Sequence, residues 1–553
     1  MNSFDSVLLL GALLAFGSVF GAGFLLAQSD EGLFPLTVIH LNDFHARFEE
    51  QNSLSTRCKP DQGEQCVGGY ARVVSAVRSL SEQYKAQNPI YLNAGDNFQG
   101  STWYTLLRWS VISYFLNLLP ADAVTLGNHE FDHGIAGVVP FMEALKSTIV
   151  VSNIDDSGEP SFQGKYQKSV VIERDGRKIG IIGVIHHSTH TLSMTEDLKF
   201  LDEVEAINGE VETLKANGVN IIIVLSHCGI EIDRKIAAQC EDVDIVVGGH
   251  SHTFLYNGTT EGLPESPVDT YPVVVDHING RKTLIVQASC FTKFIGRITA
   301  YFDESGNIVE WEGNPVYLDE SIEQDPQIVQ ELLPWKEQVD VLANRPVGSS
   351  RVLLSKDGCR VAECNFGDLV ADAFVDYHAR HRDSTDDEWT AASIGITNDG
   401  GMRTSLQKGS LTYDDLVTAV PYENTVDTFD LEGKYLWEAL EYSAGRHNSA
   451  DFLQISGLRA VFNITRSIGR RIVSVDVRCQ TCRVPRYEPL DQNKVYRLAV
   501  AAWIGNGGNG YSMFSDHRTN VKVGPFDIVA LEEYVTRMSP ILQGTDGRIR
   551  ILT

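Results

Sequence analysis

The chain has 553 residues, of which 43% are hydrophobic and 22% charged, a globular composition that excludes a disordered or collagen-like protein. Its 46 Lys and Arg against 73 Asp and Glu give a formal net charge of −27. This charge argues against a binder of nucleic-acid polymers, because phosphate contacts need clustered basic residues. A small anionic ligand stays compatible with it if the site supplies positive charge locally. The length suggests two to four domains of roughly 100–200 residues each, or two large ones.

The first feature in chain order is an apolar run that begins at Val7 and is followed by small and polar residues. We interpret residues 1–27 as a secretory signal peptide cut after Ala27, although no Lys or Arg precedes the run. An uncleaved anchor is the alternative, since about 20 apolar residues can span a bilayer. The C-terminus carries no polar spacer and hydrophobic tail of a lipid-anchor signal. We therefore expect a secreted, extracellular product without a membrane anchor in its mature form.

Short apolar strands, each followed by a turn rich in Asp, His, Asn and Gly, recur through the first three hundred residues. Helical patterns lie between several of them, at 70–87 and 202–218. Buried strands that alternate with helices predict a layered α/β sandwich, and open α/β folds place their sites at the carboxyl ends of the strands. The expected strands are 36–41, 90–95, 123–127, 178–185, 220–227 and 243–250.

The character of the chain changes after the sixth of these strands and the loops that follow it. Residues 324–345 have helical spacing with charged ends and predict a linker helix. From Pro346 onward, strand ends rich in Asp and His give way to turns rich in Gly and aromatic residues. We therefore expect a first domain at 28–323 and a second domain at 346–553.

Six of the nine cysteines lie in three close pairs, which in an exported chain indicate disulfides that staple loops. The alternative for the CxxC pair, a redox or zinc motif, lacks a second CxxC. Sequons at Asn257 and Asn463 would be glycosylated on export. Three cysteines remain, so at least one is free, and Cys228 is expected to be an inert buried thiol. The expected pairs are Cys58 with Cys66, Cys359 with Cys364 and Cys479 with Cys482, and the remaining cysteines are Cys228, Cys240 and Cys290.

Four groups of metal-ligating residue types follow the expected strands, in the motifs DFH, GDNFQG, GNHEFD and SHC with GGHSH. Taken alone, each is weak, because Asp or His at a strand end more often caps a helix or a turn. Taken together, they place mixed Asp, His and Asn donors around one cleft, which suits a pair of divalent transition ions bridged by a carboxylate. Such a pair activates water and offsets charge on a phosphoryl group, so it supplies the positive charge that the chain lacks.

This series of motifs resembles the calcineurin-like metallophosphoesterases, specifically the 5′-nucleotidase/apyrase family. The resemblance begins at about Phe34 and extends through TNDGGMR, VPYENTVDTFDLEG, LQISGLR and WIGNGGNGY in the second domain. It implies an α/β fold, a four-layer metallophosphoesterase sandwich followed by an α+β nucleotide-binding domain. It also implies two divalent metal ions, with zinc favoured over Ca, Mg or Mn. A rotation of the second domain about the linker helix would carry the substrate to the metals.

The resemblance also implies the residues of the metal site. His129 and Asp132 correspond to a catalytic dyad, in which Asp132 orients an imidazole that stabilises the transferred phosphoryl group or protonates the leaving oxygen. In relatives the position of His252 is often Gln or Asn. The implied ligands are Asp43, His45 and His252 for one ion, Asn128, His227 and His250 for the other, and Asp96 as the bridge.

For the second domain the resemblance implies a nucleotide site. Two arginines would hold phosphate oxygens through forked, charged hydrogen bonds, and two aromatic side chains would stack on the base. Asn509 stands where relatives commonly have an Asp that contacts the ribose, and an amide can bond a hydroxyl without a charge. The implied residues are Arg360, Asn398, Arg403, Tyr422, Trp503 and Asn509.

A second histidine cluster, His186, His187 and His190, matches no ligand position of the family. The cluster resembles a metal-binding motif, but we interpret it as a solvated loop after a strand.

The predicted function is a secreted two-metal nucleotide phosphohydrolase. The stretches YLNAGDNFQGSTWYTLLRW and VLSHC resemble salivary apyrases of blood-feeding arthropods, which remove phosphate from ATP and ADP and so blunt platelet aggregation. The stretch CQTCRVPRYEPL resembles instead the ecto-5′-nucleotidases that cleave AMP. We favour the apyrase, with the AMP-cleaving 5′-nucleotidase as the alternative and a non-catalytic nucleotide scavenger as a more remote one.

Overall fold

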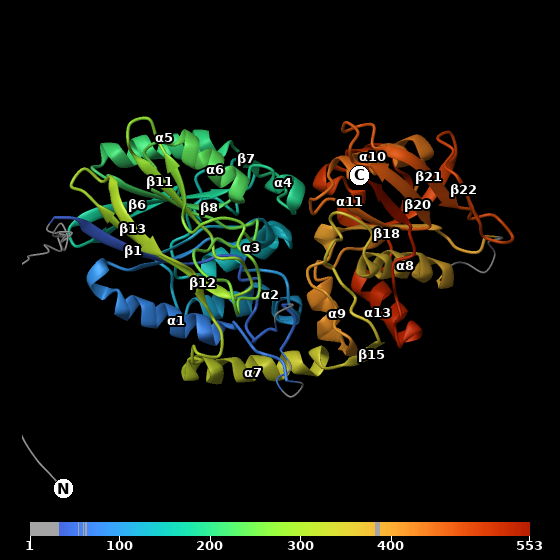
Figure 1. Ribbon diagram of the computed structural model, residues 1–553, viewed down its shortest axis with the longest axis horizontal. Helices are drawn as coiled ribbons and strands as arrows, with labels where there is room; N and C mark the ends of the chain where they lie inside the picture. The colour runs from blue at the N-terminus through green and yellow to red at the C-terminus, as the bar shows by residue number, and fades with distance from the viewer. Residues whose placement is uncertain (1–31, 53–54, 59, 61–62, 382–387) are drawn as a thin grey trace, which may run out of the picture.

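The computed structural model describes residues 32–52, 55–58, 60, 63–381 and 388–553. The predicted signal peptide at 1–27 lies outside these residues. The chain forms two lobes, and helix α7 (Pro326–Ala343) runs along the N-terminal lobe and leads at its end into the C-terminal lobe (Figure 1). Among the described helices, none combines the length and the apolar character that a membrane crossing requires.

A mixed sheet of six strands forms the first layer of strands in the N-terminal lobe, in the order β13-β12-β1-β2-β3 with β14 also paired to β12. Strands β1, β2 and β3 are parallel, so their carboxyl ends lie at one edge. Strand β12 runs antiparallel to β1. The strands are β1 (Phe34–Leu41), β2 (Ile90–Asn93), β3 (Ala123–Val124), β12 (Phe294–Phe302), β13 (Ile308–Gly313) and β14 (Val316–Tyr317).

A second six-stranded sheet has the order β10-β11-β9-β8-β6-β5. Its central strands β6, β8, β9 and β11 are parallel. The strands are β5 (Ser169–Arg174), β6 (Arg177–Ile185), β8 (Ile221–His227), β9 (Ile245–Val247), β10 (Val273–Asp276) and β11 (Lys282–Val286), and a separate short pair consists of β4 (Ile154–Asp155) and β7 (Lys199–Phe200).

The two sheets pack face to face, with helices on both outer faces. Leu36 and Val38 of β1 are buried with the strands of the second sheet, whereas Ile39 and Leu41 are buried with the helices of the first, as the alternation of a strand dictates. This arrangement confirms the predicted four-layer sandwich. Helices α1 (Tyr70–Gln83), α2 (Thr102–Leu116), α3 (Gly134–Ala144) and α7 cover the first sheet, α5 (Glu203–Ala216) and α6 (Ile230–Gln239) the second, and shorter helices are η2 (Lys85–Gln87), η3 (Asn128–Phe131) and α4 (Thr189–Leu192).

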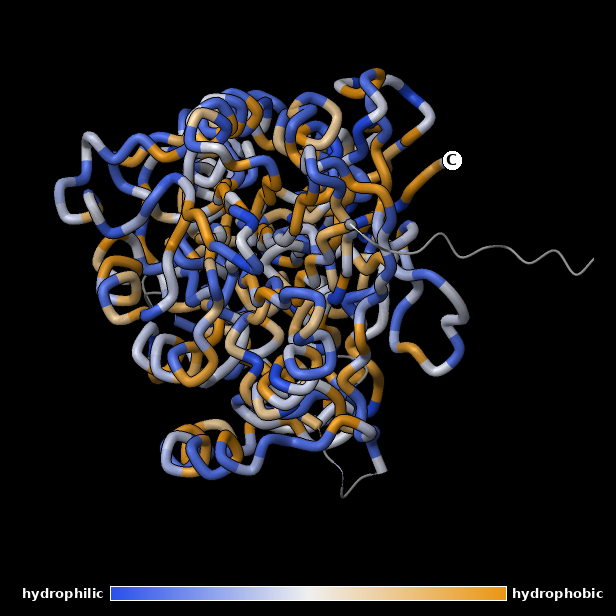
Figure 2. The backbone as a smooth tube through the Cα atoms, turned by 90° about the vertical axis from the view of Figure 1, so that its left-hand side faces the viewer, coloured by the Kyte–Doolittle hydropathy of each residue, from blue (hydrophilic) through white to orange (hydrophobic). Residues whose placement is uncertain are grey.

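All six expected strands are present, but several end earlier than predicted. Strand β2 stops at Asn93 rather than at residue 95 because Gly95 has φ = 82°. A Cβ at this position would lie 2.6 Å from the backbone nitrogen of Gly127, so only glycine fits. The chain thereby turns out of the sheet directly before Asp96. Hydrophobic and hydrophilic segments alternate along the chain in Figure 2, as expected where buried strands end in polar loops.

The C-terminal lobe contains two main sheets, in the orders β19-β16-β23-β18-β24 and β22-β21-β20-β25, and the short pair β15-β17. The strands are β15 (Pro346–Ser350), β16 (Ile394–Asn398), β17 (Gly409–Thr412), β18 (Val426–Glu432), β19 (Leu453–Ser456), β20 (Leu458–Asn463), β21 (Ile472–Arg478), β22 (Tyr487–Pro489), β23 (Val495–Ala501), β24 (Thr519–Lys522) and β25 (Ile549–Leu552). The helices are α8 (Asn365–Arg380), η4 (Asp399–Gly401), α9 (Tyr413–Ala419), α10 (Gly433–Gly445), α11 (Ala502–Gly505), η5 (Gly508–Gly510), α12 (Ser512–His517) and α13 (Asp527–Met538).

The three predicted disulfides are present, between Cys58 and Cys66, Cys359 and Cys364, and Cys479 and Cys482. Cys228, Cys240 and Cys290 are all free and buried. The burial of Cys228 raises the pKa of its thiol well above the usual value, which keeps it protonated and unreactive.

Candidate active site

The loops that follow the parallel strands converge at one edge of the sandwich. The loop after β1 is hydrogen-bonded to the loop after β2, with Asp43 N donating to Gly95 O at 3.1 Å and His45 N donating to Asp96 O at 3.0 Å. Left-handed backbone is disfavoured for residues with a Cβ and is concentrated at functional sites, where the surroundings enforce it. It occurs here at five of the predicted ligands: Asp43, His45, Asp96, His250 and His252.

The first donor cluster contains Asp43, His45 and His252. His252 Nε2 lies 3.3 Å from Asp43 Oδ1. His45 Nε2 lies 3.2 Å from His252 Nε2, so two imidazole nitrogens face each other. Their lone pairs repel unless a proton or a metal ion lies near both.

The second donor cluster contains Asp96, His227 and His250. His227 Nδ1 is bonded to Ala94 O at 2.6 Å, and its Nε2 faces Asp96 Oδ2 at 3.0 Å without a hydrogen bond of acceptable geometry. Asn128 Oδ1 lies 2.8 Å from His250 Nδ1. Asp96 Oδ2 also lies 3.7 Å from His45 Nε2, so this carboxylate stands between the two clusters.

The electrostatics of the clusters favour added positive charge. Burial opposes the ionisation of Asp96, but His227 and His129 outweigh it and hold its pKa well below the usual value. Burial likewise opposes protonation of His227, yet Asp96 and Asp43 raise its pKa to about 10. Burial and the charge of His227 lower the pKa of His250 to about 3, so His250 is neutral, as a ligand must be. Carboxylates that stabilise the protonated form of a buried imidazole also stabilise cations, so the clusters fit a site for two divalent ions.

The side chains of His129 and Asp132 form a direct hydrogen bond, with His129 Nδ1 2.7 Å from Asp132 Oδ2. The other oxygen of Asp132 accepts a hydrogen bond from Ser193 Oγ. The backbone N–H of His129 donates to Asp96 Oδ1 at 2.9 Å, which ties the pair to the second cluster. These contacts orient the ring so that Nε2 is left for the substrate side.

Glu130, which the sequence analysis did not single out, holds these loops together. Its buried carboxylate accepts hydrogen bonds from the backbone N–H groups of Gly127 at 2.6 Å, Asp96 at 3.0 Å and Asn97 at 2.6 Å. Burial, with a smaller contribution from the charge of Asp96, raises its pKa to about 7. The only signal in the sequence was its place inside the GNHEFD motif.

A cavity of about 640 Å³ lies between the lobes. Its wall includes Asp96, His129 and Asp132 from the first domain, next to the two donor clusters. From the second domain its wall includes Asn398, Arg403, Tyr422, Trp503 and Asn509. The structure therefore brings five of the six implied nucleotide residues to the same cavity as the dyad.

Arg403 and Tyr422 reach across the domain boundary. Arg403 Nη2 lies 2.8 Å from His45 Nε2 and 3.5 Å from His129 Nε2. The Tyr422 ring stacks on the His129 ring, with centroids 5.3 Å apart and an angle of 19° between the planes. A phosphate beside the dyad would thus lie within reach of a guanidinium from the second domain.

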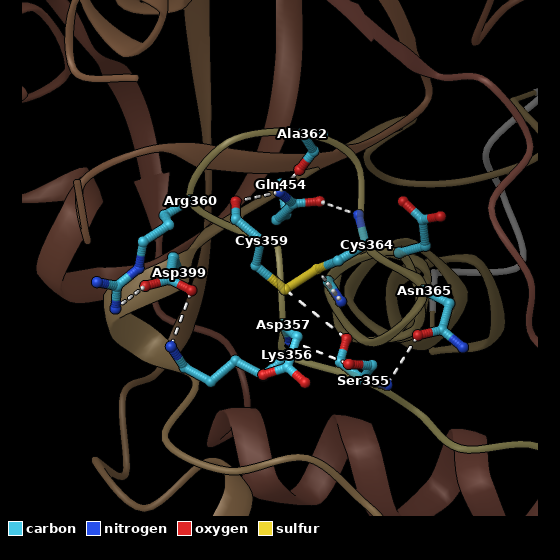
Figure 3. Close-up of a disulfide and its surroundings, with 12 residues drawn as sticks. Ser355, Lys356, Asp357, Cys359, Arg360, Ala362, Cys364, Asn365, Asp399 and Gln454 are labelled. Carbon is cyan, nitrogen blue, oxygen red and sulfur yellow. Dashed lines mark hydrogen bonds and ion pairs between the residues drawn. A yellow bond between two sulfur atoms is a disulfide. The ribbon is translucent and has the colours of Figure 1, made fainter. Parts of the chain in front are cut away.

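The sixth implied residue, Arg360, is not part of this wall. Its guanidinium is half exposed and pairs with Asp399 at 3.2 Å, and Lys356 Nζ approaches the other oxygen of Asp399 at 2.8 Å (Figure 3). Asp399 stands directly before the GGMR turn, so it competes with any phosphate for both cations. A role of Arg360 in holding the substrate stays a prediction.

The side-chain amide of Asn509 forms two hydrogen bonds within the protein. It accepts a hydrogen bond from Trp503 Nε1 at 2.6 Å and donates to Asp451 Oδ1 at 2.6 Å. It thereby fixes the Trp503 indole at the cavity wall and connects it to Asp451, whose other carboxylate oxygen is paired with Arg446.

Comparisons with known proteins agree with both halves of this arrangement. Residues 36–254 match the calcineurin-like phosphoesterase family, and residues 346–516 match the 5′-nucleotidase C-terminal domain. The chain is 48% identical over 535 residues to an apyrase of Tabanus yao, covering 95% of each protein. It is 36% identical over 526 residues to the 5′-nucleotidase of Mus musculus, covering 93% of this chain and 90% of that protein. The crystal structure of a 5′-nucleotidase precursor from Thermus thermophilus superimposes with a TM-score of 0.85 at 32% identity, covering 94% of this chain and 99% of that one.

Proposed function

This chain belongs to the 5′-nucleotidase family of calcineurin-like phosphoesterases and is a metal-dependent nucleotide phosphohydrolase, and we propose that it is a secreted enzyme of the apyrase type, removing phosphate from extracellular ATP and ADP. The observation that carries the reaction class is the cavity, whose wall combines the His129–Asp132 pair with Arg403 and two aromatic rings. The preference for ATP and ADP is supported by the 48% identity to an apyrase over nearly the whole of both chains.

The calcineurin-like fold implies a pair of divalent metal ions, for which we propose zinc. Asp43, His45 and His252 would hold one ion, Asn128, His227 and His250 the other, with Asp96 between them. When bound, such a pair supplies Lewis acidity toward a phosphoryl oxygen and toward water. Imidazole-rich donor sets are typical of zinc, whereas Ca and Mg prefer oxygen donors alone.

The dyad would act on the transferred phosphoryl group. Asp132 accepts the hydrogen bond from His129 Nδ1, so the proton of a cationic imidazole is held at Nε2, which faces the cavity. From there it stabilises negative charge on the phosphoryl oxygens or protonates the leaving oxygen. Arg403 Nη2, close to His129 Nε2, would add a charged donor to the same oxygens.

The nucleoside would bind at the second-domain end of the cavity. Tyr422 and Trp503 present two aromatic surfaces there, and stacking on such surfaces tolerates any flat base. Since Asn509 is bonded to both Trp503 and Asp451, we propose that Asp451 supplies the carboxylate that relatives place at position 509. We further propose that rotation of the second domain about α7 admits the substrate.

An AMP-cleaving 5′-nucleotidase is the second candidate, favoured by the likeness to the Thermus thermophilus 5′-nucleotidase precursor. Phosphate release from ATP, ADP and AMP, each supplied alone to the purified protein, separates the two. Release from ATP and ADP supports the apyrase, and export of this activity would blunt ADP-driven platelet aggregation. Release from AMP alone overturns the apyrase in favour of the nucleotidase, and binding without any release would indicate a scavenger.

A further inference from the structure

The histidine cluster after β6 is not an isolated solvated loop. The His186 and His187 rings stack on each other, with centroids 4.8 Å apart. Glu203, the first residue of α5, contacts the His187 ring, with its Oε1 2.9 Å from His187 Nδ1. One potential ligand atom from each of the three residues lies within 4.8 Å of the others. His190, the third histidine of the sequence motif, is exposed and lies outside this group.

Glu203 is the unusual member, because its side chain is completely buried. Its Oε1 accepts hydrogen bonds from the backbone N–H of His187 at 2.7 Å and from His187 Nδ1 at 2.9 Å. Its Oε2 is buried without any hydrogen-bond partner. Leaving a buried carboxylate oxygen unpaired is costly, and such an atom calls for an unseen ligand.

We propose that His186, His187 and Glu203 form a third divalent transition-metal site, distinct from the pair at the strand ends. Two imidazoles and one carboxylate are a donor set typical of zinc, and the exposure of His187 leaves coordination positions for water. An ion held by His187 Nδ1 and the Glu203 carboxylate would take the place of the proton that Nδ1 donates to Glu203 Oε1, and in the neutral ring this proton moves to Nε2. The site shares no donor with the second cluster, although the His186 and His250 rings lie 5.6 Å apart.

The position of this site connects it to the substrate cavity. The chain continues from His187 through α4 to Leu192, Ser193 and Met194, which line the cavity. Ser193 Oγ donates to the dyad carboxylate of Asp132. A metal ion that anchors the start of this short segment would therefore restrain the residue that orients the dyad.

The test is a count of bound ions in the full-length protein. Wild type, His187→Asn and His190→Asn are equilibrated with Zn²⁺ alone, freed of excess ion, and analysed by mass spectrometry for zinc per chain. Asn at position 187 keeps a donor for Glu203 Oε1, and the control changes an exposed histidine of the same loop. We expect His187→Asn to hold one ion fewer than wild type and His190→Asn to hold the wild-type number.

An equal zinc content in wild type and His187→Asn overturns the proposal. So does the lack of an anomalous zinc peak between His186, His187 and Glu203 in crystals of the wild type equilibrated with Zn²⁺, a result that depends on no variant. Both readings are independent of nucleotide hydrolysis. A failure of the third site is thus distinguishable from a failure of the proposed apyrase activity.

Discussion

Arg108 of the first domain and Glu423 of the second form an ion pair across the domain boundary, with Nη2 2.8 Å from Oε2. Arg108 interrupts helix α2 with φ = 56°, and Glu423 has φ = 54°. The same guanidinium contacts His133 Nε2 at 2.6 Å, next to the dyad residue Asp132. Because Glu423 directly follows Tyr422, this pair helps to hold the Tyr422 ring over His129.

Replacing Arg108 by Met should weaken the contact between the two domains beside the cavity. A partly exposed ion pair contributes up to about 1 kcal/mol, so kcat/KM should fall by up to about fivefold. Arg380→Met, which breaks a comparable pair with Glu533 inside the second domain, is the matched control. Steady-state kinetics with the preferred nucleotide give kcat/KM for both variants. Equal kcat/KM values for the two would contradict a role for Arg108 in holding the domains together.

Removing the dyad imidazole with His129→Ala should lower kcat by roughly 10²–10⁴-fold, the usual contribution of a positioned acid–base group. Asp132→Asn should lower it less, because an amide oxygen still accepts from His129 Nδ1 but no longer stabilises a cationic ring. Metal content should be unchanged in both variants. Turnover at the wild-type rate in His129→Ala would refute the catalytic assignment.

Truncation of Glu130 should destabilise the loops that carry Asp96 and Asn128. Glu130→Ala leaves the N–H groups of Gly127, Asp96 and Asn97 without their acceptor, at a cost of about 3 kcal/mol or more. Glu143→Ala, at an exposed position on α3, should change the free energy of unfolding by less than about 0.5 kcal/mol. Denaturant unfolding compares the two, and similar losses would show that Glu130 is dispensable.

Removal of metal ions should abolish hydrolysis without unfolding the protein. The sandwich core consists of apolar side chains between the sheets and helices, so circular dichroism should be retained after EDTA treatment. Activity should fall by about 100-fold or more, since Lewis acidity contributes several kcal/mol to such reactions. It should return on addition of Zn²⁺. Activity that persists after exhaustive chelation would exclude a two-metal mechanism.

Loss of the indole in Trp503→Ala should raise KM by roughly 5–150-fold, because stacking on a base is worth about 1–3 kcal/mol. The increase should be similar for adenine and guanine nucleotides, as stacking does not read the base edge. Trp503→Phe keeps an aromatic face but loses the bond to Asn509, and it separates stacking from positioning. An Ala variant with wild-type KM would remove Trp503 from the nucleotide site.

Strands, disulfides and the type of chemistry were accessible from the sequence because each depends on local patterns. The apolar run 178–185 predicted β6, and the spacing of Cys359 and Cys364 predicted their bond. Strand ends were less accurate, since the turn at Gly95 depends on its closeness to Gly127, which is far away in the chain. Glu130 went unrecognised because a buried carboxylate that accepts only backbone hydrogen bonds has no sequence pattern of its own.

By itself, then, the sequence determined which donors end which strands and in what order, because the periodicity of a strand and the chemistry of Asp and His are local properties. Only the tertiary structure decided which of these side chains meet. In the folded chain Arg360 pairs with Asp399 and does not line the cavity. Arg403 contacts His45, and Glu203 contacts His187. Such contacts join residues that are distant in sequence, so their distances follow from how sheets, helices and lobes pack and not from any motif.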